Sequence, residues 1–237
     1  MIAGVSDAST PTTTPAPWWL LAAVLAIATA WNLTGNLALP GAWYVPANLA
    51  VAAVLLALAW RAGLDADDLA VRPGDLGRGL LVGLGAAAVI AAVLALALVI
   101  PALDGALESD DVLADSTTDR WFVPLVRIPL GTAVFEEVLF RSVLLGALLT
   151  RWSTRTALAA SSVLFGLWHV VPAWETTSGS AAATTGAIVG TVVVTTVAGL
   201  LFGGLRLRSR SVVAPILAHI GTNSFAYVAA LVALDLL

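Results

Sequence analysis

One apolar stretch in the middle of the chain carries three charged side chains. Residues 133–146 read AVFEEVLFRSVLLG and contain Glu136, Glu137 and Arg141 in a segment that is otherwise typical of a membrane helix. A single charge at the bilayer centre costs about 2.5–3.5 kcal/mol on insertion scales. The three charges therefore need compensating partners, and ionisable residues at such depth usually mark a function.

Helical spacing places two of these three charges on one face of the helix and the third on another. Glu137 and Arg141 are separated by one helical turn, with the glutamate on the N-terminal side, which is the better orientation for an ion pair. Glu136 lies about 100° around the helix from Glu137 and so points elsewhere. We therefore expect Glu137 and Arg141 to compensate each other, and Glu136 to face a cavity.

The only two histidines of the chain lie in other apolar segments. His169 follows Phe165 by one helical turn in LFGLWHVVP, and His219 precedes Asn223 by one turn in PILAHIGTNSF, so each pair shares a helix face. Glutamate can act as a general base toward water. Histidine can orient that water or bind a metal, and histidine or asparagine can donate hydrogen bonds to an oxyanion. We expect Glu136, both histidines and Asn223 to line one polar cavity suited to hydrolysis.

The composition places these residues in a membrane protein. The chain has 237 residues, of which 59% are hydrophobic and 11% charged, whereas about 25% of a soluble protein is charged. The absence of cysteine excludes disulfides and thiolate metal sites. A net charge of −4 and a pI near 5.0 argue against nucleic-acid binding. The expected partner is the lipid bilayer.

The predicted fold class is all-α, a polytopic membrane helix bundle. A span needs about 20 apolar residues, and seven transmembrane helices are predicted at 18–39, 44–60, 79–100, 122–150, 156–171, 184–205 and 212–234. Pro124, Pro129 and Gly131 interrupt the fourth segment, so we expect a short lead-in and then a helix from about residue 130. If the lead-in at 121–130 forms its own helix, the count is eight. Pro172 is expected to stop the fifth span.

Domain organisation follows from the same pattern. Residues 1–17 are small, polar and rich in proline and threonine, which predicts a disordered N-terminal tail. Residues 18–237 are expected to form a single transmembrane domain, whose core at about 120–237 contains every candidate site residue.

Arginine placement orients the bundle. With seven spans, the arginine clusters between spans two and three, four and five, and six and seven all fall on one side, and the acidic segment 102–120 falls on the other. The positive-inside rule makes the arginine-rich side and the N-terminus cytoplasmic. The lysine-free, alanine-rich composition indicates a GC-rich bacterial genome and hence a multi-pass protein of the plasma membrane.

Three motifs carry a resemblance to a known family. EEVLFR (136–141) fits EExxxR, FGLWH (165–169) fits FxxxH, and HIGTN (219–223) fits HxxxN. In this order on separate predicted helices, they resemble the CPBP family of intramembrane proteases, which includes the type II CAAX prenyl endopeptidases and bacteriocin-processing or immunity proteins. The resemblance covers residues 120–237, and the first 120 residues match only in being hydrophobic spans.

The resemblance implies a role for each motif residue. Glu136 is implied as the catalytic base and His169 as its partner on the water. His219 and Asn223 are implied as the pair that stabilises the oxyanion. The residues with an implied structural or supporting role are Glu137, Arg141 and Phe165.

Two questions of chemistry stay open at the level of sequence. Glu136, His169 and His219 are candidate ligands for zinc with a water as fourth ligand, and a metal-independent glutamate mechanism is equally compatible with the motifs. The implied function is an intramembrane endopeptidase that cleaves a membrane-associated peptide or protein, in CAAX-type or bacteriocin processing. The alternatives are an ion-coupled transporter and a non-catalytic peptide-binding or immunity protein.

The orientation can be tested with reporter fusions at residues 110 and 208. Because the acidic segment and the last arginine cluster are predicted on opposite sides, the two fusions should give opposite topology signals. Matching signals from the two sites would contradict the predicted orientation.

Overall fold

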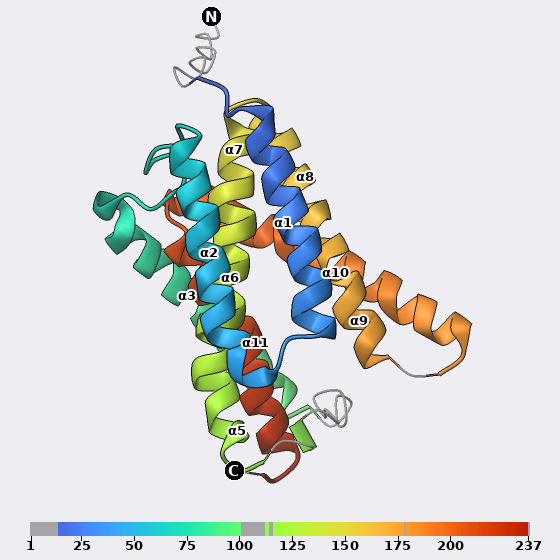
Figure 1. Cartoon of the computed structure of the whole chain (residues 1–237). Coiled ribbons are helices and arrows are strands. Elements are labelled where there is room, and N and C mark those ends of the chain that lie inside the picture. Colours follow the sequence, from blue (N-terminus) through green and yellow to red (C-terminus); the bar gives the residue numbers. More distant parts are fainter. Residues whose placement is uncertain (1–13, 101–111, 114–115, 178, 237) are drawn as a thin grey trace, which may run out of the picture.

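The computed structural model describes residues 14–100, 112–113, 116–177 and 179–236, and these residues form helices and turns without a strand. The principal helices are α1 (Trp18–Leu37), α2 (Tyr44–Arg61), α3 (Leu76–Ala97), α8 (Thr154–Trp168), α9 (Val170–Thr176), α10 (Ala181–Ser209) and α11 (Val213–Ala233) (Figure 1). Short 3₁₀ turns at Gly41–Trp43 and Pro73–Asp75 precede α2 and α3. Six candidate spans in the described residues are long and apolar enough to cross a membrane. The predictions of an all-α fold and of a multi-pass membrane protein are confirmed.

The fourth predicted span is one unbroken helical run of changing helix type. It consists of α5 (Asp119–Phe122), the π-helical stretch η4 (Val123–Ala133), α6 (Val134–Glu137), the π-helical stretch η5 (Val138–Leu144) and α7 (Leu145–Leu149). The expected lead-in is therefore not separated from the helix that follows. Proline in an α-helix clashes with the carbonyl four residues earlier, and the wider π turn leaves room for Pro124 and Pro129.

The fifth predicted span breaks at His169 and not at Pro172. His169 ends α8 with φ −84° and ψ 1°, and α9 begins at the next residue. Pro172 lies in the first turn of α9, where its missing N–H removes no intrahelical bond. The prediction that Pro172 stops the helix is wrong for this reason, and a candidate site residue occupies the joint between two helices.

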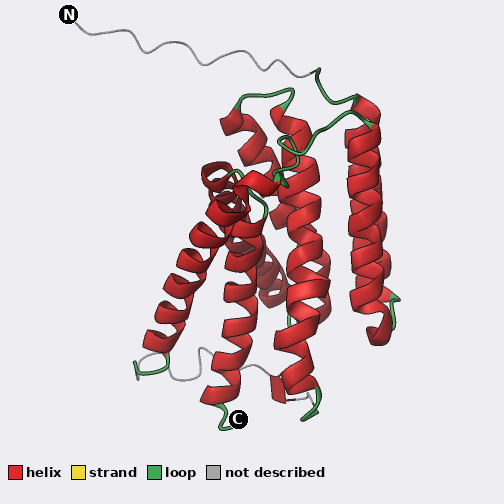
Figure 2. Cartoon of the chain, turned by 90° about the vertical axis from the view of Figure 1, so that its left-hand side faces the viewer, coloured by secondary structure: helices red, strands yellow, loops and turns green. Residues whose placement is uncertain are grey.

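Small residues allow the long helices to approach closely. A Cβ atom added at Gly83 of α3 would lie 3.0 Å from the Cα atom of Ala214 in α11, and one added at Gly199 of α10 would lie 2.9 Å from the Cα atom of Ser162 in α8. Helix association in membranes depends on such packing, because lipid tails are as apolar as the helix surfaces. In Figure 1, α1 and α2 stand close to upright, whereas α10 is steeply inclined to them. Figure 2 shows the bundle from the side.

The arginine-bearing turns meet at one end of the bundle, together with the start of α1. Arg206 donates to the backbone carbonyl of Asp68, in the turn between α2 and α3. The backbone N–H of Ala16 donates to Thr150, and Arg151 donates to the carbonyl of Ala16. Ala16, at the end of the predicted tail, is thus buried, whereas residues 1–13 of that tail lie outside the described residues. Most of the acidic segment 102–120 also lies outside them.

The α8–α10 contact predicts the effect of two glycine substitutions in one helix. Gly199→Ala should lower the apparent melting temperature in detergent, because its Cβ would meet the backbone of Ser162, and overpacking typically costs about 1–3 kcal/mol. Gly190→Ala is the matched control, since no atom lies within 4 Å of its added Cβ. Alanine should stabilise the helix there by about 1 kcal/mol. Equal melting temperatures for the two variants would contradict the close packing.

Candidate active site

Two of the three charged residues in the 133–146 segment, Glu137 and Arg141, form a buried ion pair. Nη1 of Arg141 lies 3.0 Å from Oε1 of Glu137, and both side chains are almost fully buried, at 1% and 0% exposure. The Arg141 guanidinium also lies over the ring of Phe165, 3.9 Å from its centroid, and 5.3 Å from that of Phe202. The predicted pairing of Glu137 with Arg141 is confirmed, and aromatic faces add to the compensation of the cation.

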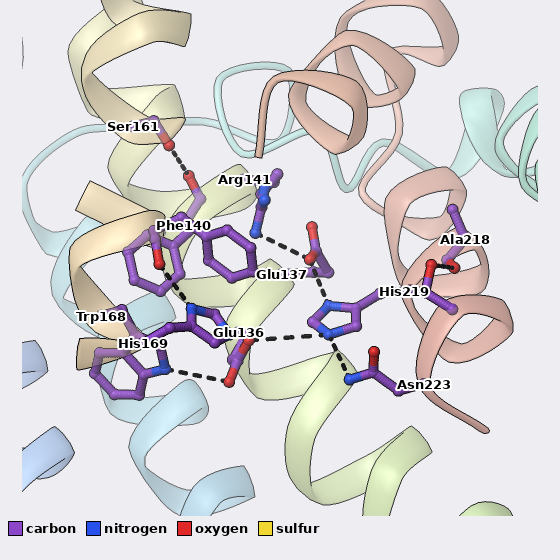
Figure 3. A network of polar contacts seen from close by, with 12 residues as sticks. Glu136, Glu137, Phe140, Arg141, Ser161, Trp168, His169, Ala218, His219 and Asn223 are labelled. Atoms are coloured by element: carbon purple, nitrogen blue, oxygen red, sulfur yellow. Dashed lines mark hydrogen bonds and ion pairs between the residues drawn. The ribbon is translucent and has the colours of Figure 1, made fainter. Parts of the chain in front are cut away.

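The same glutamate oxygen holds a histidine from another helix. Nδ1 of His219 in α11 lies 2.8 Å from Oε1 of Glu137 (Figure 3). A carboxylate oxygen only accepts, so Nδ1 carries the hydrogen in this bond. The amide Nδ2 of Asn223 donates to the other ring nitrogen, Nε2, at 3.1 Å. His219 is therefore fixed at both nitrogens, by Glu137 on one side and by Asn223 on the other.

Glu136 is held at one carboxylate oxygen and free at the other. The indole N–H of Trp168 donates to Oε1 at 3.2 Å. The second oxygen, Oε2, is buried and has no hydrogen-bond partner in the described part of the chain. It lies 3.9 Å from Nε2 of His219, which is too long for a direct hydrogen bond. A carboxylate oriented through one oxygen, with the other free to accept a proton, has the geometry that a general base needs.

His169 points a free ring nitrogen toward the same place. Its Nδ1 lies 2.8 Å from the backbone carbonyl of Phe165, and a carbonyl accepts, so the hydrogen of the neutral ring is on Nδ1. Nε2 then has an available lone pair. The His169 and Phe165 rings meet edge to face with centroids 4.7 Å apart. The expectation that these two residues share a face is confirmed.

Glu136 and His169 line one pocket of about 220 Å³. His219 and Asn223 are not among its lining residues, so the expected single cavity contains two of the four predicted side chains. Of the other two, His219 approaches Glu136 to 3.9 Å, and Asn223 bonds to His219. The remaining lining residues are Trp31, Gly35, Asn36, Tyr44, Asn48, Thr132, Phe135, Trp168 and Pro172.

Half of this pocket comes from the first two helices, which sequence analysis treated only as hydrophobic spans. The indole of Trp31 in α1 donates to Oδ1 of Asn48 in α2 at 2.6 Å. The hydroxyls of Tyr44 and Thr132 lie 3.1 Å apart. The sequence did indicate part of this wall, because Asn48 lies in an apolar span, and an asparagine in such a position usually faces the protein interior.

Two aromatic residues of the site were also missed. Trp168 precedes His169 directly, and a buried indole N–H normally needs an acceptor, which here is Glu136. Phe202 of α10 stacks on His219 with ring centroids 5.2 Å apart and an interplanar angle of 25°. Nothing in the local sequence around Phe202 indicates this contact, since it depends on how α10 packs against α11.

The candidate zinc ligands do not form a metal-binding cluster. Within the described residues, no group of three or more His, Cys, Asp or Glu side chains is arranged to hold a metal ion. Nε2 of His219, the ring nitrogen not bonded to Glu137, accepts a hydrogen bond from Asn223 at 3.1 Å. Glu136, His169 and His219 thus do not match the three-ligand arrangement of catalytic zinc, and no chemical step below uses a metal.

The fold and site together define a polytopic helical membrane protein with a buried carboxylate–imidazole centre. Residues 118–225 match the family model described as Type II CAAX prenyl endopeptidase Rce1-like, so this segment is similar to a domain of a protease family. The match contains all three motifs and confirms the family resemblance inferred from them. No curated protein and no solved structure matches the chain.

The buried pair predicts how two substitutions affect folding. Glu137→Gln and Arg141→Ala should each lower the yield and melting temperature of the purified protein, because each leaves a buried partner without its counter-charge. Breaking a buried pair typically costs about 3–5 kcal/mol. Arg155→Ala, at an exposed arginine, is the control and should behave as wild type. Unchanged melting temperatures for both pair variants would show that the pair has no structural role.

Proposed function

We propose that this protein is an intramembrane endopeptidase that hydrolyses a peptide bond in a membrane-associated protein or peptide, with a CAAX-type substrate as the first candidate. The observation that carries the proposal is the free Oε2 atom of Glu136, buried beside His219 in a pocket shared with His169. The Rce1-like match supports a protease of this class.

The geometry supports an ordered set of roles. Oε2 of Glu136 takes a proton from a water molecule, which then attacks the scissile carbonyl. The resulting Glu136 carboxylic acid returns this proton to the amine nitrogen as the C–N bond breaks. Nε2 of His169 accepts the second hydrogen of that water and orients it. Nδ2 of Asn223 has two hydrogens, of which one is donated to His219. The other is available to the developing oxyanion, and His219 holds the amide in place.

The supporting residues keep this set in position. The bond from the Trp168 indole holds Oε1 of Glu136, and this leaves Oε2 as the basic atom. Glu137 fixes His219 through Nδ1, and so sets the place of Asn223 one turn further along α11. These bonds matter because the catalytic groups must be held in a defined position relative to the reacting atoms.

We also propose the membrane topology within which the site works. The helical run of residues 119–149 is longer than the roughly 20 residues that a span requires, and we count it as a seventh span beside the six candidates. An odd number of spans fits the opposite positions of the start of α1 and the end of α11 (Figure 1). The arginine-bearing end then faces the bacterial cytoplasm and contains the N-terminus.

The decisive variant is Glu136→Gln, which keeps the side-chain size and removes the base. Purified wild type should cleave a membrane-tethered peptide from a library, and the variant should bind this peptide equally well but cleave it about 10²–10⁴-fold more slowly. The assay measures cleavage and binding on the same reconstituted samples. Glu175→Gln, at an exposed glutamate in α9, is the matched control and should cleave at the wild-type rate.

Other outcomes would favour other functions. Cleavage at the wild-type rate by well-folded Glu136→Gln protein would refute the assigned base. Peptide binding without cleavage by either protein would indicate a sequestering protein. Ion flux that depends on Glu136, with no peptide cleaved, would indicate a transporter.

A further inference from the structure

A second buried charge, distant in sequence from the site motifs, is Arg206, which interacts with the Asp68 carboxylate only beyond ion-pair distance. Arg206, near the end of α10, is 5% exposed, and its Nη2 donates to the backbone carbonyl of Asp68. Its Nε has no hydrogen-bond partner in the part of the chain that the structure describes, and no ion pair to Arg206 occurs there. Buried arginines are rare unless paired. An anion bound at contact distance would therefore compensate the charge of this guanidinium.

Arg206 lines a pocket of about 360 Å³ whose charge is positive. The pocket also contains Arg72, Arg210 and Asp67, with Ala70 and Leu207 as its apolar wall. The ion pair of Arg72 with Asp67, at 3.3 Å, is largely exposed and therefore weak. Three guanidinium groups and one carboxylate line the pocket, and the Asp68 carboxylate interacts with Arg206 from outside the lining. The lining itself has an excess of positive charge, which favours an anionic ligand.

The backbone holds this pocket in an unfavourable conformation. Arg210, which caps α10, has φ +56°, and Ala70 on the facing turn has φ +54°. Glycine is the usual residue at such a helix end, because the left-handed conformation is unfavourable for residues with a Cβ atom. The backbone bond from Val212 to the carbonyl of Ala70, at 2.9 Å, ties the two segments together. The chain keeps a guanidinium here where glycine would be less strained.

The surroundings of the pocket indicate a lipid. The pocket lies at the end of α10, a candidate span, and just before α3, another span that contacts α10. Leu76 and Leu80, in the first turns of α3, are 44% and 47% exposed. An apolar surface therefore begins directly beside the arginine residues. Basic pockets between membrane helices bind lipid headgroups, and arginine matches the geometry of phosphate oxygens.

We propose that the pocket of Arg72, Arg206 and Arg210 binds the phosphate of an anionic phospholipid in the leaflet at the arginine-rich end of the bundle. The headgroup phosphate contacts the guanidinium groups, and the acyl chains run along α3 and α10. This site is separate from the Glu136 pocket and stands independently of the proposed peptidase activity.

The test compares lipid binding by the full-length protein in mild detergent. The probes are phosphatidylglycerol, phosphatidylcholine with the same acyl chains, and inorganic phosphate, with bound lipid counted by native mass spectrometry. The exposed arginines are replaced in the double variant Arg72→Gln/Arg210→Gln, which leaves Arg206 and its bond to Asp68 in place. Losing two arginines should weaken phosphatidylglycerol binding about 30-fold.

The control is Arg208→Gln, an exposed arginine on the same helix that does not line the pocket. It should bind phosphatidylglycerol nearly as wild type does, and wild type should prefer phosphatidylglycerol to phosphatidylcholine. Equal binding by the double variant and the control would overturn the proposal, as would equal affinity for both lipids. Complete displacement of the lipid by millimolar inorganic phosphate would assign the pocket to free phosphate instead.

Discussion

A single oxygen atom, Oε1 of Glu137, organises the polar interior of this bundle. It accepts from Arg141 one turn further along its own helical run and from His219 on α11. Charges in a low-dielectric interior must be matched closely, since their desolvation is not otherwise repaid. This requirement fixes the rotation of α11 against the helical run, and so determines where Nε2 of His219 and the amide of Asn223 lie relative to Glu136.

The division of labour between the two adjacent glutamates follows from this constraint. In both glutamates Oε2 has no partner among the described residues. Oε1 of Glu137 is held by Arg141 and His219, whereas Glu136 receives one indole hydrogen bond and lines the pocket. Consecutive residues in a helix point about 100° apart. One of them can therefore face the structural pair while the other faces the pocket. The EE sequence places a carboxylate of the buried ion pair directly beside the carboxylate that we propose as the base.

The sequence predicted the parts of this arrangement that depend on local geometry. The Glu137–Arg141 and His219–Asn223 contacts follow from spacing within one helix, and both occur. The helix break at His169 escaped prediction, because proline in a first turn and proline at a helix end look alike in sequence. The contributions of Asn48 and Phe202 escaped it because they depend on how distant helices pack.

The wall of the pocket built by α1 and α2 has a consequence for modularity. All three motifs lie within residues 118–225, yet Trp31, Tyr44 and Asn48 belong to helices outside that segment. The segment that matches the family model and the set of helices that build the pocket therefore have different boundaries. An excised segment would retain every motif side chain and lose one side of its binding cleft. Exchange of the first two helices between homologues would reshape the cleft while leaving the motif residues untouched.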